Sequence, residues 1–341
     1  MYKLNKEGYI MKDENIKLYN TEYLQKRSTL VHESKYVKIS EIQVTPTIES
    51  VNTEIDVERF SPNKYNEELL HFIIIMTENF PIENVKFFYK NLTNLKVKSQ
   101  FLLSLIKSQG FYNCKKNMVV VDSKKAKKVI YHELLHMASS IVMNQYFTGF
   151  FQSITNNKRV GNGLNEGYTE LLSHRYFNAD NKAYTSHVLL ASQLEKIIGK
   201  EKMEELYFKA DLLGLINILR KYASDEEIEK FLFNMDYTLN FYKMNKKCTE
   251  LDKILNYFNE IYKFLINCYA RKLGKNINHS NDTEKLQAIK KLMEYACNFT
   301  PGYYFDNGQT ALIMSEEQMI DYIMNAKNYI FANNIMIKKL S

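Results

Sequence analysis

Two histidines and a glutamate in the segment Tyr131–His136 have the spacing of a metal-binding helix. His132 and His136 are four residues apart, so on a helix their side chains lie on the same face. Two neutral imidazoles held in this way can bind one zinc ion. Glu133 lies next to the first histidine, where it can take a proton from a water bound to the metal. The spacing therefore predicts one helix that carries both metal-ligating and proton-transferring side chains.

Two further glutamates follow at a distance that fits the same site. Glu166 lies 30 residues after His136, and it can be the third protein ligand that a catalytic zinc usually has beside a position open to water. Glu170 lies one helical turn later, where its carboxylate can accept a hydrogen bond from a ligating histidine. His174 continues this stripe by another turn, as a side chain that assists the transition state or as a capping or surface histidine. Without the upstream motif, both glutamates would be interpreted as a solvated acidic face.

Together these motifs resemble those of the gluzincin metallopeptidases. In that family one helix carries HExxH, and a second carries a glutamate ligand followed four residues later by an acidic residue. The matching residues are His132-Glu133-Leu134-Leu135-His136 and Asn165-Glu166-Gly167-Tyr168-Thr169-Glu170, and the stretch Leu164–Leu172 is also similar to uncharacterised bacterial gluzincin-like proteins. The resemblance covers about Asn117–Phe177. It implies a zincin fold, zinc and hydrolysis of peptide bonds, without a particular substrate. Because the sequence shows one ligand set, we expect one zinc ion per chain.

The resemblance also implies an oxyanion-stabilising side chain and a strand that pairs with substrate. Gluzincins commonly use a downstream tyrosine or histidine for the oxyanion, and the candidates here are Tyr168, Tyr184 and His187. The spacing does not single one out, and a purely structural role is the alternative for each. Zincins pair extended substrate with an edge strand before the catalytic helix, and Asn117–Val121 is the expected strand. A plain core strand is the alternative for that segment.

The elements that position these residues can be predicted from local patterns. Met118–Val121 is a short apolar run, which indicates a buried strand. The region from Lys124 to about Tyr146 lacks Gly and Pro, which predicts a helix. Thr148–Lys158 contains turn residues and predicts a loop near the site. Leu164–Phe177 predicts the second site helix.

The whole chain is predicted to be α+β and predominantly α. We expect a polar extension over 1–37, a zincin-like catalytic domain over 38–180 with a small sheet and two metal-site helices, and an all-helical region over 181–341. Possible strands are Val37–Ser40, Ile42–Val44 and Leu95–Val97. The helices predicted outside the site are Tyr65–Phe80, Val85–Leu92, Lys98–Lys107, Tyr184–Ile198, Lys200–Phe208, Leu212–Tyr222, Asp225–Phe233, Thr249–Leu273, Thr283–Cys297 and Glu316–Lys339.

The composition narrows the class of protein. With 341 residues, 45% of them hydrophobic and 25% charged, the chain can bury real cores and is not of the disordered class. The 4 cysteines are far apart, which argues against a cysteine zinc site and for reduced cytosolic thiols. There is neither an apolar signal core at the N-terminus nor an apolar run of about 18 residues, so we expect a cytoplasmic protein without a membrane segment. The net charge is +7, but no nucleic-acid-binding motif accompanies it.

These observations predict zinc-dependent hydrolysis of a protein or peptide substrate. His132, His136 and Glu166 would hold the metal, and Glu133 would act as general base on the bound water. The alternative is a non-enzymatic helical interaction or regulatory protein with a structural or silent zinc site. A structural site is normally closed by a fourth protein ligand, and the sequence shows no obvious one. A third hypothesis is a regulatory peptidase of a mobile element that cuts a repressor, for which no DNA-binding motif is visible.

Overall fold

The chain folds into two compact units. The structure, a computed structural model, describes residues 2–4, 10–12, 36–60, 64–100, 109–122, 126–155, 158–179, 184–244, 251–276, 282–297, 303–306 and 309–312. One unit, the site unit, comprises Val37–Asn181 and Ile198–Asn217, and the other, the helical unit, comprises Met1–Tyr36, Lys182–Ile197 and Ile218–Ser341. The fold is α+β and mostly helical, as predicted. The site unit spans the expected domain 38–180 and also includes a later segment of the chain.

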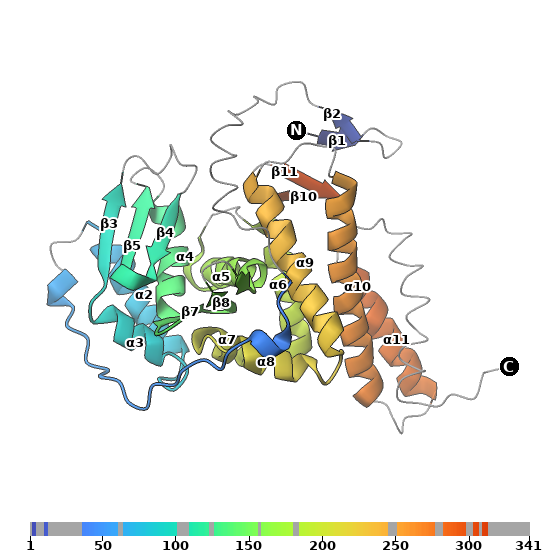
Figure 1. Cartoon of the computed structure of the whole chain (residues 1–341), viewed down its shortest axis with the longest axis horizontal. Coiled ribbons are helices and arrows are strands. Elements are labelled where there is room, and N and C mark those ends of the chain that lie inside the picture. Colours follow the sequence, from blue (N-terminus) through green and yellow to red (C-terminus); the bar gives the residue numbers. More distant parts are fainter. Residues whose placement is uncertain are drawn as a thin grey trace. The chain divides into compact units, whose positions relative to one another are not determined.

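A three-stranded sheet of the site unit lies against the helix that carries HExxH (Figure 1). Its order is β3 (Lys96–Gln100), β5 (Met118–Asp122) and β4 (Gly110–Asn113), with β3 parallel and β4 antiparallel to β5. The valines of β5 are buried, which confirms the predicted buried strand. The prediction that this strand is an edge was wrong. The chain turns back through a short 3-10 turn, Cys114–Lys116, so β4 occupies the edge instead.

The helix α4 (Ala126–Ala138) ends well before Tyr146, where the sequence pattern placed its end. Hydroxyl groups beyond its last turn donate to carbonyls of that turn. The Ser139 hydroxyl donates to the Leu135 carbonyl at 3.0 Å, and the Thr148 hydroxyl donates to the His136 carbonyl at 3.2 Å. Such side-chain bonds compete with continued helix, and they satisfy groups that a helix end leaves unpaired.

The segment that follows is a four-stranded antiparallel sheet, so the loop predicted over Thr148–Lys158 was wrong. Its strands pair in chain order, β6 (Ser140–Val142), β7 (Tyr146–Thr148), β8 (Phe151–Thr155) and β9 (Lys158–Val160). The loop was predicted from the turn residues of this segment, but the aromatic residues between them favour a sheet. Phe147, Phe150 and Phe151 are buried, and that apolar area is removed from water only when the strands pair.

Residues 36–60 run across the site unit without forming the predicted strands. Ile39–Glu41 and Glu58–Phe60 are 3-10 turns, and the residues between them form neither helix nor strand. The side chain of Gln152 on β8 takes the place of a strand partner. It accepts a hydrogen bond from the Gln43 N–H at 2.9 Å and donates one to the Gln43 carbonyl at 3.1 Å. One amide side chain thus satisfies both main-chain groups of Gln43.

The second site helix, α5 (Asn162–Phe177), follows directly after this sheet and confirms the predicted helix. It begins at Gly161, whose φ is +81° and where a Cβ would lie 1.9 Å from the Phe150 carbonyl oxygen, so only glycine fits. The helix α7 (Lys200–Phe208) places Tyr207 against the rings of Phe150 and Tyr168. The helix that carries Glu166 and Glu170 is therefore packed directly against the core of the site unit.

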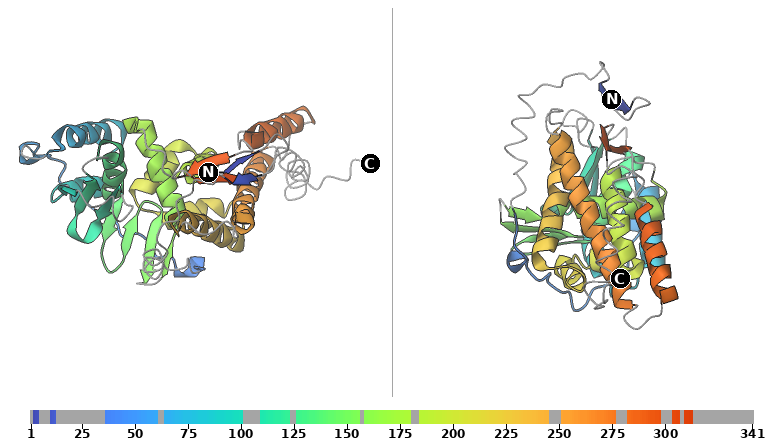
Figure 2. Two further views of the ribbon diagram at one scale, coloured as in Figure 1. Left: turned by 90° about the horizontal axis from the view of Figure 1, so that it is seen from above. Right: turned by 90° about the vertical axis from the view of Figure 1, so that its right-hand side faces the viewer.

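The other predicted helices are confirmed with shifted ends. Those of the site unit are α2 (Asn66–Asn79) and α3 (Lys86–Leu92), both of which contribute buried residues to its core. The helix α8 (Leu212–Leu219) lies mostly in the site unit as well. The helices of the helical unit are α6 (Thr185–Ile198), α9 (Asp225–Met244), α10 (Leu251–Asn276) and α11 (Asp282–Cys297). The helices α9 and α10 lie side by side (Figure 2).

The helical unit is not all-helical, which corrects the prediction for 181–341. The strands β10 (Tyr303–Asp306) and β11 (Gln309–Leu312) pair antiparallel, as do β1 (Tyr2–Leu4) and β2 (Ile10–Lys12). Aromatic residues followed by Asn-Gly are a hairpin pattern that the prediction overlooked. Of the predicted helix 98–107, residues 98–100 belong to β3 and the rest lies outside the described residues, as does the predicted helix 316–339. None of the helices that the structure describes is long and apolar enough to cross a membrane.

Candidate metal centre

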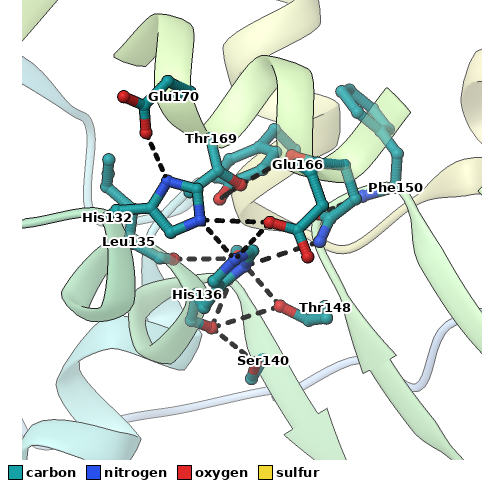
Figure 3. A network of polar contacts seen from close by, with 12 residues as sticks. His132, Leu135, His136, Ser140, Thr148, Phe150, Glu166, Thr169 and Glu170 are labelled. Atoms are coloured by element: carbon teal, nitrogen blue, oxygen red, sulfur yellow. Dashed lines mark hydrogen bonds and ion pairs between the residues drawn. The ribbon is translucent and has the colours of Figure 1, made fainter. Parts of the chain in front are cut away.

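Three side chains from α4 and α5 converge on one point of the site unit (Figure 3). The Nε2 atoms of His132 and His136 are 3.0 Å apart. The Oε2 atom of Glu166 lies 3.2 Å from the first of these nitrogens and 3.7 Å from the second. The expected ligand set is thus assembled from two helices that are distant in the sequence.

These distances can be compared with what a zinc ion requires. Four tetrahedral donors at the usual zinc bond lengths lie about 3.3–3.4 Å from one another. The three observed separations, 3.0, 3.2 and 3.7 Å, bracket that value. Two imidazoles and one carboxylate are also a donor set that zinc takes, whereas magnesium and calcium prefer oxygen ligands. The residues present therefore fit a zinc ion.

Glu170 orients the first histidine. Its Oε2 atom lies 2.7 Å from Nδ1 of His132, so that nitrogen donates and Nε2 is left to face the ligand group. Glu170 is fully buried, and burial by itself raises the pKa of a carboxyl group. Hydrogen bonds from His132 and His174 outweigh this effect and hold the pKa of Glu170 below its usual value. For His132, burial opposes the charge, but Glu166 and Glu170 hold its pKa well above the usual value.

Glu133 lies in the same helix but faces a different neighbour. Its carboxylate accepts a hydrogen bond from the main-chain N–H of Tyr112, on the edge strand β4. A Cβ added at Gly110 would lie 3.1 Å from its Cγ, so the absence of a side chain there makes room for it. Burial raises the pKa of Glu133 to about 7, although the charge of His132 acts in the opposite direction. Glu133 is thus a buried, weakly acidic group beside the metal ligands and outside their donor set.

Asn165 and Tyr207 are two neighbours of the site that the sequence analysis did not single out. The Asn165 amide accepts the Phe150 N–H at 3.1 Å and places its Nδ2 atom 3.4 Å from Nδ1 of His136. The Tyr207 hydroxyl lies 2.7 Å from Oγ1 of Thr169. Asn165 directly precedes Glu166, which was a usable signal. The position of Tyr207 has no local signal, because it depends on how α7 packs.

The three oxyanion candidates have different surroundings. Tyr168 is fully buried in the site unit, where its ring packs against Phe150 and Tyr207. His187 is fully buried in the helical unit, where its Nε2 atom lies 3.2 Å from a main-chain carbonyl of α9. Tyr184 immediately precedes α6 and has a φ of +57°. The candidate metal ligands, Glu133 and Glu170 share the site unit with Tyr168, whereas Tyr184 and His187 belong to the helical unit.

Comparisons of the chain with protein-family models, with curated proteins and with solved structures returned no match. The functional argument therefore depends on the geometry and chemistry of the site.

Proposed function

We propose that the chain is a zinc-dependent hydrolase of peptide bonds, with His132, His136 and Glu166 as metal ligands and Glu133 as general base. One observation carries the proposal. Three donor atoms from α4 and α5 converge at separations suited to zinc. Glu133, from the helix that carries both histidines, is held beside them but outside the donor set. A helix that only presented polar residues to solvent would not bury His132, Glu133 and His136 together.

Each residue has a part in the proposed reaction. A bound zinc would supply a Lewis acid that polarises the scissile carbonyl and lowers the pKa of water. Glu133, with a pKa of about 7, is suited to take a proton near neutral pH and to return it to the leaving amine. Glu170 keeps the Nδ1 proton of His132 in place, so that Nε2 offers its lone pair to the metal.

The edge strand β4 is the segment on which we propose that the substrate lies. Among the described strands, β4 pairs only with β5, which makes it an edge of this sheet, and extended peptides bind such edges as an added strand. Its Tyr112 N–H holds Glu133, which places the general base directly beside this strand. Phe111 is 36% exposed and can contact a bound side chain. The substrate-pairing role predicted for 117–121 thus moves to the neighbouring strand.

A structural zinc site in a non-enzymatic protein is the alternative. Such a site is normally closed by a fourth protein ligand. Among the residues that the structure describes, the group that could hold a metal contains three, His132, His136 and Glu166. This composition leaves a coordination position for water and supports the hydrolytic proposal.

The substitution Glu133→Gln tests the proposal. It keeps the size of the side chain and the metal ligands but removes the base. Cleavage of substrates found by proteome-wide profiling with the wild type should fall by about 10²–10⁴-fold, whereas zinc content and melting temperature stay near those of the wild type. Glu204→Gln is the matched control, because Glu204 is similarly buried but accepts its hydrogen bonds from Arg175 and Tyr176.

Two results would contradict the proposal. One is cleavage by Glu133→Gln at the wild-type rate. The other is a wild-type protein that holds zinc but cleaves no protein in the profiled proteome, which would favour the structural alternative. Loss of activity in the Glu204→Gln control at unchanged stability would show that the assay reports buried carboxylates in general.

A further inference from the structure

The carboxylate of Glu170 binds two imidazoles, one on each oxygen. Its Oε2 atom lies 2.7 Å from Nδ1 of His132, and its Oε1 atom lies 3.0 Å from Nε2 of His174. His174 lies one turn further along α5, with 37% of its side chain exposed, whereas the Glu170 side chain is completely buried. A partly exposed histidine is therefore connected to a metal ligand through one buried carboxylate.

The two contacts depend on each other because the carboxylate is a single rigid group. When Oε1 is held by His174, rotation of the carboxylate is restricted and Oε2 stays in line with His132. If that donor is removed, a buried oxygen loses its hydrogen bond, and the carboxylate gains by turning toward any other donor or water. Such a rotation would weaken its bond to His132 and leave the imidazole less well oriented.

We propose that His174 is a positioning residue for the metal centre, holding Glu170 so that His132 presents Nε2 to the metal. The inference rests on the proposed zinc site and adds a residue that acts on it from outside the ligand group. A role of His174 in ending α5 does not explain why its ring contacts Glu170. The α5 C-cap is Asn178, whose N–H bonds to the Ser173 carbonyl, while the His174 ring points at Glu170.

Zinc affinity of the full chain, measured by competition with a chromophoric chelator at one fixed pH, tests this role. His174→Phe keeps a planar ring but has no donor, and it should weaken zinc binding about 10-fold, at the low end of the range for groups that orient a ligand. His174→Gln retains an N–H at similar reach and should return the affinity to near the wild-type value. Cobalt absorption spectra provide a second readout, with bands shifted in the Phe variant and restored in the Gln variant.

Arg175→Gln is the matched control on the same helix. Arg175 pairs with Glu204 of α7 at 2.9 Å, so this change should lower stability without lowering zinc affinity. A double-mutant cycle adds a test that compares the effect of the same substitution in two backgrounds, so it does not rest on the behaviour of a single variant. In a Glu170→Gln background, His174→Phe should cause little further loss, because the group it positions has been altered.

The inference is overturned if His174→Phe binds zinc as tightly as the wild type. It is equally overturned if His174→Gln is as weak as His174→Phe, since ring packing would then be responsible, or if Arg175→Gln weakens zinc binding as much. These measurements need no substrate. A wild type that binds no zinc would refute both proposals, whereas normal zinc binding without proteolysis would refute the hydrolase alone.

Discussion

The buried side chains of helix α5 include several polar ones, whereas those of helix α10 are almost all apolar. Asn165, Thr169, Glu170 and Ser173 of α5 are buried together with its apolar residues. In α10, the buried side chains that the structure describes are apolar or aromatic with one cysteine, namely Ile254, Phe258, Ile261, Tyr262, Phe264, Leu265, Ile266, Cys268 and Ala270. Burial of the α10 face is favourable by itself, whereas each buried polar group of α5 requires a partner.

Three of these polar groups have partners on other elements of the site unit. The Asn165 amide binds the Phe150 N–H, the Thr169 hydroxyl meets that of Tyr207, and Glu170 meets His132. None of the charged side chains of α10 that the structure describes is among its buried residues, and Arg271, which is 17% exposed, pairs with Glu227 of α9 at 3.0 Å. The comparison indicates that α5 is specialised for holding atoms in place and α10 for stability. Three experiments test this comparison: two act on the site that α5 helps to form, and one acts on the core of α10.

The largest effect should come from His136→Ala. The variant removes one of the three proposed ligands, so dialysed protein should lose most of its zinc, which we expect to be close to one ion per chain in the wild type. Elemental analysis by mass spectrometry measures this content. His71→Ala is the control, because His71 is an exposed histidine of α2 that contacts Tyr131 and lies outside the donor set. Unchanged zinc in His136→Ala would refute the ligand assignment.

The next effect concerns stability and belongs to α10. Phe258 is fully buried, so Phe258→Ala should lower the free energy of unfolding by about 3–5 kcal/mol through lost burial and the cavity it leaves. Denaturant unfolding followed by circular dichroism measures the change. Leu286 of α11 is 68% exposed, and Leu286→Ser should stay within about 0.5 kcal/mol of the wild type. Equal losses in the two variants would mean that α10 does not form the core described above.

The smallest of the three effects is expected for Glu170→Ala on α5. Zinc affinity should fall about 10–100-fold, as for other carboxylates that orient a ligating histidine. The loss of unfolding free energy without metal should be smaller than for Phe258→Ala, because the two histidines that pair with Glu170 can lose their protons and need not stay as unpaired charges. Chelator competition and denaturant unfolding measure the two quantities. If Glu170→Ala keeps normal zinc affinity but loses much stability, α5 contributes to stability and not to positioning of the site, contrary to the comparison above.

Local patterns predicted the helices and strands well where helix-breaking residues and the periodicity of apolar residues agreed. The helix α7 has the predicted bounds, Lys200–Phe208, because Gly199 with a φ of +100° interrupts the chain just before it. The end of α4 and the sheet after it were mispredicted. Residues 139–160 mix hydroxyl, β-branched and aromatic side chains, which are compatible with helix, strand or loop until pairing partners are known.

The sequence by itself determined the chemistry available to the site. The spacing of His132, Glu133 and His136 follows from helix geometry alone, and Glu166 was the matching third donor in the expected second helix. Tertiary structure decided how those atoms are used. It set Nε2 of both histidines toward Glu166, gave Glu170 a second imidazole from His174 and placed the edge strand β4 beside Glu133. Helical spacing is a property of neighbouring residues, whereas these contacts join segments far apart in the sequence and form only when the helices and sheet pack.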